Sequence, residues 1–151
     1  IARRGVPVVL MHALGDPRTM QEAPAYDHVS LDVFDYLESR IKVCLNAGIA
    51  RESIVVDPGI GFGKTLEHNL TLLRDLALFR ALGCPILLGA SRKRFIGTLT
   101  GEQQAGRRVA GSVAAALAGA SAGARFLRVH DVLETVQALR VWQGIEGMER
   151  S

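Results

Sequence analysis

The sequence predicts a parallel α/β fold from two observations. Four short apolar runs are nearly continuous in hydrophobicity rather than alternating, which is typical of strands covered on both faces. Each run is followed by a segment whose apolar residues recur at helical spacing, so strand and helix alternate four times. Because parallel neighbours need a crossover helix between them, this alternation favours right-handed βαβ units.

The predicted strands cover residues 6–13 (VPVVLMHA), 53–59 (SIVVDPG), 85–93 (PILLGASRK) and 124–132 (ARFLRVHDV). The helices after them are predicted at 27–47, 67–82, 107–122 and 134–142, and the second ends at Gly83, a residue type that commonly terminates helices. Four such units form either a small open doubly wound sheet or half of an eight-stranded barrel. A whole barrel has about 250 residues, so half of one fits the 151 residues present.

Composition narrows the class of protein. The chain is 48% hydrophobic and 22% charged, as soluble globular proteins are, and no apolar run approaches the ~20 residues that cross a bilayer, so we expect a cytoplasmic protein and no membrane. A net charge of +3 spread along a chain with 5% aromatic residues argues against nucleic acid and is compatible with an anionic small molecule. Cys44 and Cys84 stand alone, so we expect buried thiols and no metal site.

Polar side chains mark the carboxyl ends of all four predicted strands. His12 ends the first and Asp57 the second, Ser91 and Lys93 end the third, and Arg128 and His130 the fourth. In both candidate architectures ligands bind at that edge. The sequence therefore predicts one site assembled from four strand ends.

The stretch DPGIGFGKTLEHN, residues 57–69, invites comparison with a phosphate-binding P-loop. Only three residues separate Gly59 from Gly63, where a P-loop has four, and Pro58 occupies the position of the expected glycine, where it supplies no N–H donor. Asp57 suggests other chemistry, because a carboxylate at a strand end accepts two hydrogen bonds at once. It suits a guanidine-like edge such as that of an aminopyrimidinone; alternatively, Asp57 caps the helix that follows.

Four ordered motifs, LMHALGDPRTMQ, VVDPGIGFGKTLEHN, LLGASRKRFIG and RVHDVLETVQALRV, resemble the C-terminal half of the dihydropteroate synthase family over residues 8–142. The resemblance implies a (β/α)8 TIM barrel, of which residues 1–151 would supply strands five to eight as four βα units. It also implies a transferase of folate biosynthesis that joins p-aminobenzoate to 6-hydroxymethyl-7,8-dihydropterin pyrophosphate, releases pyrophosphate and is inhibited by sulfonamides.

The resemblance also implies roles for residues. Asp57 would hold the amino edge of the pterin, Lys93 its carbonyl and ring nitrogen, and Met11, Gly61 and Phe62 would wall the pterin slot.

Arg128 and His130 would grip the pyrophosphate, and with Lys93 they are the expected catalytic residues, acting by electrostatic stabilisation. Ser91 and Arg92 would border the p-aminobenzoate pocket.

Several polar residues of these motifs could instead have purely structural roles. His12 could end its strand with a satisfied imidazole, Arg92 and Arg94 could be solvated charges at a helix start, and Lys64 is expected at the surface once a P-loop is rejected. The alanine-rich segment 111–124 is either core or a surface for close packing against a partner, and the family's homodimer contact through the C-terminal barrel helices favours the second reading.

The sequence departs from the family pattern at Ala13, Leu14, Asp16 and Ile60. The resemblance implies a Mg²⁺ cofactor that is held mainly by the N-terminal half of the family's barrel. That half is not in the sequence. The chain also begins with Ile1 rather than Met, so we expect a fragment of a longer product that is inactive alone; two copies pairing into a complete barrel is the alternative. Two other functions remain open, a pterin-dependent methyltransferase barrel and a non-catalytic pterin-binding remnant.

Overall fold

Four parallel strands follow one another in chain order. The structure, a computed structural model, describes residues 5–15 and 25–147. Its strands and α-helices are β1 (Val8–Met11), α1 (Val29–Asn46), β2 (Ile54–Asp57), α2 (Leu66–Arg74), β3 (Leu87–Leu88), α3 (Arg94–Thr100), α4 (Val109–Ser121), β4 (Phe126–Leu127) and α5 (Val132–Ile145), with short 3₁₀ helices η2 (Arg51–Ser53), η3 (Leu76–Leu82) and η4 (Ala105–Arg107). No helix of the described residues is long and apolar enough to span a membrane.

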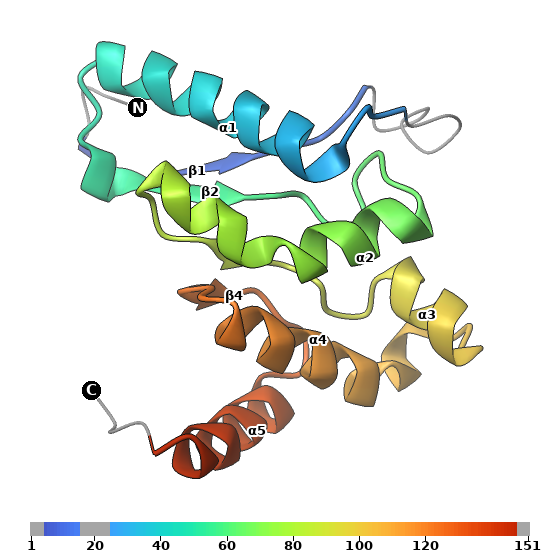
Figure 1. Cartoon of the computed structure of the whole chain (residues 1–151). Coiled ribbons are helices and arrows are strands. Elements are labelled where there is room, and N and C mark those ends of the chain that lie inside the picture. Colours follow the sequence, from blue (N-terminus) through green and yellow to red (C-terminus); the bar gives the residue numbers. More distant parts are fainter. Residues whose placement is uncertain (1–4, 16–24, 148–151) are drawn as a thin grey trace.

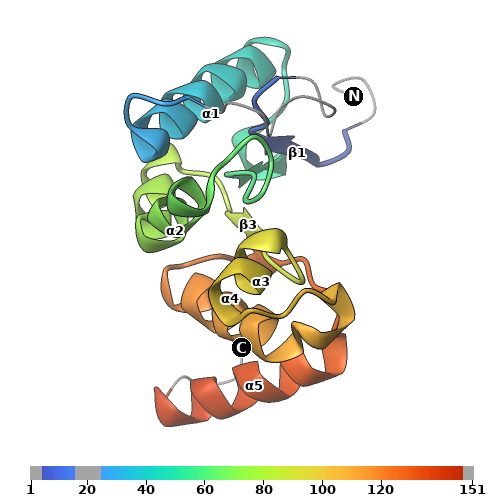
Figure 2. The same ribbon diagram turned by 90° about the vertical axis from the view of Figure 1, so that its right-hand side faces the viewer.

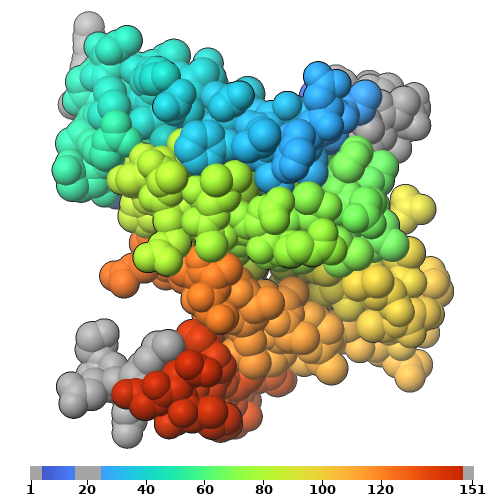
Figure 3. Space-filling view, viewed as in Figure 1, coloured from blue at the N-terminus to red at the C-terminus, as the bar shows by residue number. Residues whose placement is uncertain are grey.

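The strand order distinguishes between the two architectures that the sequence leaves open. β1 pairs with β2 and β3 with β4, all parallel, and a parallel bridge between Val56 and Ile86 joins the two pairs. The strands of the described residues therefore run in one direction, without the reversal of strand order that defines a doubly wound sheet. Helices α1, α2, α4 and α5 lie side by side in the same order (Figure 1). Their surfaces follow one another in that order in the space-filling view (Figure 3).

The two faces of the sheet differ in burial. Ile54, Val56, Ile86 and Leu88 point one way and are at most 1% exposed, because they pack against the helices. The opposite face is open: Val9 on β1 remains 51% exposed and Phe126 on β4 50% exposed. We call this the concave face, and the view turned by 90° shows α1 and α2 on one side of β1 and β3 (Figure 2).

Three elements differ from the sequence prediction. The strands are shorter than the apolar runs, and predicted helix 67–82 is instead α2 followed by the 3₁₀ helix η3, ending as predicted at Gly83 in a left-handed conformation. Its buried residues Leu76, Phe79 and Leu82 are spaced by three, which is the period of a 3₁₀ helix. Helix α3, which was not predicted, buries the side chains of Phe95 and Ile96.

The small residues of α4 allow close packing within the chain. A Cβ at Gly119 would lie 2.2 Å from Leu88 Cδ2, and one at Gly111 would lie 2.4 Å from Ile96 Cγ2. Ala115 and Ala116 are buried on the same helix. The alanine-rich segment therefore packs as core against β3 and α3.

We expect Gly119→Ala to lower the free energy of unfolding by about 1–3 kcal/mol, because the added methyl overlaps Leu88 in a packed core. Gly144→Ala, in α5, is the matched control: nothing lies within 4 Å of its Cβ position, and removing a helical glycine should stabilise by up to about 1 kcal/mol. Thermal unfolding of both variants measures the difference. Equal melting temperatures would contradict the packing of α4 against β3.

Candidate active site

The concave face carries an apolar layer and, next to it at the carboxyl ends of the strands, a polar layer. The register aligns Val9 with Val55 and Met11 with Asp57. Leu87 aligns with Phe126 in the other pair, so Gly89 and Arg128 come two residues later on the same face. Asp57 and Arg128 therefore lie at the same edge, although they are 71 positions apart in the sequence.

The carboxylate of Asp57 is 2% exposed, and its position is fixed by its own turn. Oδ1 accepts a hydrogen bond from Gly59 N–H at 2.8 Å, and Oδ2 lies 3.6 Å from Arg128 Nη2. Burial raises the pKa of the Asp57 carboxyl, while the Gly59 N–H and the cations Lys93, Arg128 and Lys64 oppose that rise. The alternative role of Asp57 as a helix cap is wrong, because the Thr65 side chain caps α2 by accepting from His68 N–H.

Gly89 makes the approach of Arg128 to Asp57 possible. A Cβ at Gly89 would lie 2.9 Å from Arg128 Nη2, so the guanidinium passes over β3 where this residue has no side chain. Arg128 and His130 were expected on the last strand, but β4 ends at Leu127 and both residues lie beyond it. A glycine within an apolar strand run is a signal for such a close approach, and the sequence interpretation did not use it.

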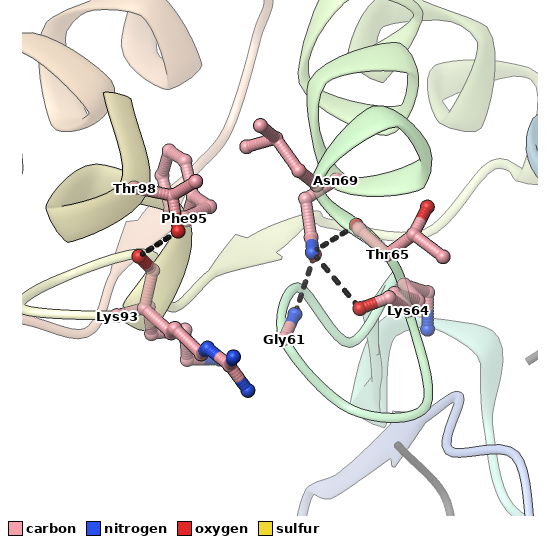
Figure 4. A pocket seen from close by; sticks show the side chains of 9 residues that line it. Gly61, Lys64, Thr65, Asn69, Lys93, Phe95 and Thr98 are labelled. Atoms are coloured by element: carbon pink, nitrogen blue, oxygen red, sulfur yellow. Dashed lines mark hydrogen bonds between the residues drawn. The ribbon is translucent and has the colours of Figure 1, made fainter. Parts of the chain in front are cut away.

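The glycine-rich loop is closed by its own hydrogen bonds rather than shaped around a phosphate. Gly59 N–H donates to Asp57 and Gly61 N–H donates to Asn69 Oδ1 at 2.6 Å. Asn69, a buried residue of α2, also donates to the carbonyl of Thr65 at 2.6 Å (Figure 4). Two of the loop N–H groups that a phosphate would need are thus engaged within the chain, which supports the rejection of a P-loop.

Lys93 extends across the loop after β2. Its stem passes 3.1 Å from the Cβ position of Gly61, a residue with φ +81° that leaves room for it. The ammonium donates to the carbonyl of Ile60 and lies 4.4 Å from the centre of the Phe62 ring. Burial lowers the pKa of Lys93 to about 8, and Asp57 opposes this shift. Lys93, Gly61 and Phe62, predicted to share a site, are therefore in contact.

Lys64 was expected at the surface, and this expectation is wrong. The side chain is 4% exposed, with Nζ 3.0 Å from His12 Nδ1 and 3.0 Å from the carbonyl oxygen of Phe62. Burial lowers the pKa of Lys64 to about 7, and the Asp57 carboxylate opposes the shift. The ammonium thus links the end of β1 to the loop after β2 and does not face solvent.

His12 is a satisfied buried imidazole beneath this loop. The backbone N–H of His12 donates to the carbonyl of Asp57 at 3.1 Å, and the imidazole ring contacts Tyr36 edge-on at 4.9 Å between ring centroids. Burial, with Lys64 beside the ring, lowers the pKa of His12 to about 4. Of the two roles that the sequence left open, the geometry supports the structural one.

We predict a loss of stability in mild acid that depends on His12. Its folded pKa of about 4 lies below the usual 6.5, so the unfolded chain binds the proton more readily. The contribution of neutral His12 to the free energy of unfolding is complete above pH 6.5 and is lost as the pH falls toward 4. The loss between pH 7 and pH 5 amounts to about 2 kcal/mol. Denaturant unfolding at both pH values measures it.

The control for this prediction is His12→Gln, which cannot titrate in this range. The difference in unfolding free energy between pH 7 and pH 5 should be smaller in the variant by about 2 kcal/mol. An identical pH dependence in both proteins would show that His12 is not the responsible group.

The turn between β3 and α3 is strained and clamped. Arg92 has φ +57°, and no other non-glycine residue of the described chain has positive φ. The Arg92 guanidinium forms a two-point ion pair with Asp131, donating from Nε at 3.1 Å. The backbone N–H of Arg92 donates to Ser112 Oγ at 2.8 Å. Arg108 donates to its carbonyl at 3.0 Å. Arg92 is therefore not a solvated charge; the ion pair also holds the pKa of the Asp131 carboxyl below its usual value.

Ser91 and His130 form a second link between the same two segments. Ser91 Oγ lies 3.0 Å from His130 Nδ1 and accepts the His130 backbone N–H at 3.2 Å. The Ser91 side chain is buried, whereas His130 is exposed. Neither Ser91 nor Arg92 lines the cavity described below, so their predicted place beside p-aminobenzoate stays a prediction.

Replacing Arg92 separates its strain from its ion pair. Arg92→Ala and Arg92→Gly both remove the guanidinium, but only alanine keeps a side chain at positive φ. We expect the glycine variant to be more stable by about 1 kcal/mol. Urea unfolding of the two variants checks this, and an alanine variant at least as stable as the glycine variant would contradict the strained turn.

A cavity of about 400 Å³ lies between the glycine-rich loop and α3. Figure 4 shows Lys93, Phe95 and Thr98 on one side and Gly61, Thr65 and Asn69 on the other. The full lining is Gly61, Lys64, Thr65, Leu66, Asn69, Lys93, Arg94, Phe95 and Thr98. Three cations and an aromatic ring among these residues suit an aromatic anion.

The geometry defines a class of protein, one whose parallel strands gather polar groups at their carboxyl ends around a buried carboxylate. The comparisons name the family. A model of pterin-binding enzymes matches residues 1–130. The chain therefore belongs to the pterin-binding enzyme family.

Individual relatives agree with this assignment. Dihydropteroate synthase of Escherichia coli is 50% identical over 140 residues, which are 93% of this chain and 49% of that protein. The Xanthomonas albilineans dihydropteroate synthase structure with 4-aminobenzoic acid superposes with a TM-score of 0.91 at 48% identity, covering 98% of this chain and 52% of the other. The Yersinia pestis dihydropteroate synthase structure with a sulfonamide drug superposes with a TM-score of 0.93 at 42% identity, covering 97% of this chain and 53% of the other. The chain spans about half the length of the relatives it matches.

Proposed function

We propose that the chain forms strands five to eight of a (β/α)8 barrel and supplies the pterin and pyrophosphate groups of a dihydropteroate synthase. The observation that carries this proposal is the buried carboxylate of Asp57, which faces the concave side at the strand ends with Lys93 and Arg128 beside it. Strand order in one direction and an open apolar face support the barrel half, because barrel interiors are filled by such layers.

The carboxylate suits the pterin. Asp57 Oδ2 has no partner within hydrogen-bond distance among the described residues, since Arg128 stands at 3.6 Å, so it can accept from adjacent NH and NH₂ donors. Lys93, held over Phe62, can donate to the pterin carbonyl and ring nitrogen. Met11 shares the face of Asp57, as a wall of the slot requires.

Arg128 and His130 are placed for the leaving group. The Arg128 side chain is 59% exposed, so a pterin that occupies Asp57 leaves the guanidinium able to turn toward the pyrophosphate. Breaking the bond from the pterin methylene to oxygen places negative charge on the departing pyrophosphate. Lys93, Arg128 and His130 would stabilise that charge electrostatically, and the p-aminobenzoate nitrogen would then attack the cationic methylene and lose one of its N–H protons to solvent.

The cavity beside α3 is the proposed site for p-aminobenzoate. Phe95 offers an apolar wall, and Arg94 and Lys93 offer cations for the carboxylate. Lys93 lines this cavity and also neighbours Asp57, so the two substrates would meet at that side chain. The 4-aminobenzoic acid complex of the Xanthomonas albilineans relative supports this substrate class.

The described residues do not fit a Mg²⁺ site. Asp57 has three cations near it and Asp131 is paired with Arg92, and no group of three or more His, Cys, Asp or Glu side chains converges within the described part of the chain. Mg²⁺ prefers several oxygen ligands. We therefore propose that other parts of the complete enzyme hold the ion.

Helix α5 supports a proposed homodimer through the C-terminal helices. Its packed side faces α4, and several large apolar side chains face solvent: Val132, Leu133, Val136, Val141 and Ile145. Apolar surface of this kind marks association surfaces in proteins.

A pterin-dependent methyltransferase barrel would use the same aspartate without a pyrophosphate leaving group. Arg128 and His130 beside the strand ends favour the synthase, because methyl transfer gives them no anion to bind. Pyrophosphate release by the complete enzyme separates the synthase from both the methyltransferase and a non-catalytic pterin-binding protein.

We expect the 151-residue chain to bind 6-hydroxymethylpterin pyrophosphate and Asp57→Asn to weaken that binding by at least about 30-fold, since the amide presents an N–H₂ to the pterin donors. Isothermal titration calorimetry measures both affinities. Asp35→Asn, at an exposed position of α1, is the matched control and should bind like the unchanged chain.

Equal affinities of the Asp57 and Asp35 variants would refute Asp57 as the pterin anchor. We expect no turnover from the chain alone, because the other half of the barrel, strands one to four, is required to complete the site. Dihydropteroate formation by the purified chain would contradict the half-barrel proposal while leaving the role of Asp57 intact.

A further inference from the structure

The hydrogen bonds between Ser91 and His130 determine where the polar hydrogen atoms of the two side chains lie. Ser91 is a buried residue, 6% exposed, and its hydroxyl accepts the His130 backbone N–H and lies 3.0 Å from Nδ1 of the same residue. Among the described residues Ser91 Oγ has no other hydrogen-bond partner. The single hydroxyl hydrogen must therefore point at Nδ1 or remain buried without an acceptor.

The position of the ring proton follows from this accounting. If Nδ1 carried the hydrogen, the buried hydroxyl hydrogen would have no acceptor, at a cost of about 1–3 kcal/mol. If Nδ1 accepts from Ser91, both groups are satisfied and the ring proton lies on Nε2. Nε2 points away from Ser91, and no described residue is hydrogen-bonded to it.

We propose that Ser91 is a positioning residue that fixes the tautomer and orientation of His130, so that Nε2–H is held as a donor for the pyrophosphate group of the substrate. The inference rests on the proposed function for the identity of that group. The tautomer of His130 is independent of the proposed function, because it follows from the hydrogen bonds within the chain.

The surroundings of the pair make it rigid. Ser91 precedes Arg92 and His130 precedes Asp131, so the Arg92–Asp131 ion pair is a second link beside the Ser91–His130 hydrogen bonds. Ser112 fixes the backbone of this turn from α4. A hydroxyl held by two neighbouring anchors can impose one ring orientation, which a freely rotating serine cannot.

A nucleophilic role for Ser91 is not supported by this geometry. The oxygen accepts the His130 backbone N–H, and the side chain is buried away from solvent. Ser91 therefore acts through His130 and does not contact the reacting atoms.

The tautomer can be read directly by NMR. Long-range ¹H–¹⁵N spectra at about pH 8, where a free imidazole is neutral, report which ring nitrogen carries the proton. The chain has four histidines, and His130→Gln assigns the relevant signals by their loss. We expect His130 to show only the Nε2–H tautomer and Ser91→Ala to show both. A protonated Nδ1 in the unchanged chain, or identical spectra with and without the hydroxyl, would overturn the proposal.

Binding of inorganic pyrophosphate provides the functional readout. With ring and tautomer no longer fixed, Ser91→Ala should weaken pyrophosphate binding about fivefold, because a smaller fraction of molecules presents Nε2–H. Ser39→Ala, an exposed serine on α1, is the control and should leave the affinity unchanged. Equal affinities of the Ser91 and Ser39 variants would contradict the positioning role.

The two readouts separate this inference from the proposed function. If the unchanged chain does not bind pyrophosphate, the proposed grip by Arg128 and His130 fails, and the ring spectrum alone then decides the role of Ser91. If pyrophosphate binds but His130 populates both tautomers, the grip stands and the role of Ser91 is refuted.

Discussion

The buried charge of Asp57 is the constraint on which the other features of the site depend. A carboxylate that is 2% exposed is costly unless opposite charges and hydrogen-bond donors surround it. Those groups come from the loop after β2 and from the segments after β3 and β4, as Lys64, Lys93 and Arg128. The carboxylate therefore couples elements that meet only when the parallel sheet has formed in the correct order.

The features that bring these groups together are small residues and backbone turns. Gly89 leaves space for Arg128 over β3, and Gly61 leaves space for Lys93 along the loop. Arg92 accepts a strained conformation because an ion pair and two backbone hydrogen bonds hold it. Strain of this kind, held by surrounding contacts, is typical of functional sites.

Much of the fold was predictable from local signals, and the site only in part. Continuous apolar runs, each followed by a segment of helical periodicity, indicate four βα units, and a polar residue at each strand end places Asp57, Lys93 and Arg128 at one edge. The burial of Lys64 was not predictable, because it depends on contact with His12, 52 positions away. The pairing of Arg92 with Asp131 is equally non-local, whereas the period of three in η3 was present in the sequence and was read as an α-helix.

The concave face links the fold to the proposed function, since it exposes an apolar layer, as the interior of the proposed barrel requires, beside the proposed pterin anchor. The most direct test is a crystal structure of the chain with 6-hydroxymethylpterin pyrophosphate bound. We expect the pterin amino edge within about 3 Å of the Asp57 carboxylate oxygens, with the pyrophosphate against Arg128 and His130. A pterin bound elsewhere, or bound with Asp57 still buried beneath Arg128 and out of contact, would contradict it.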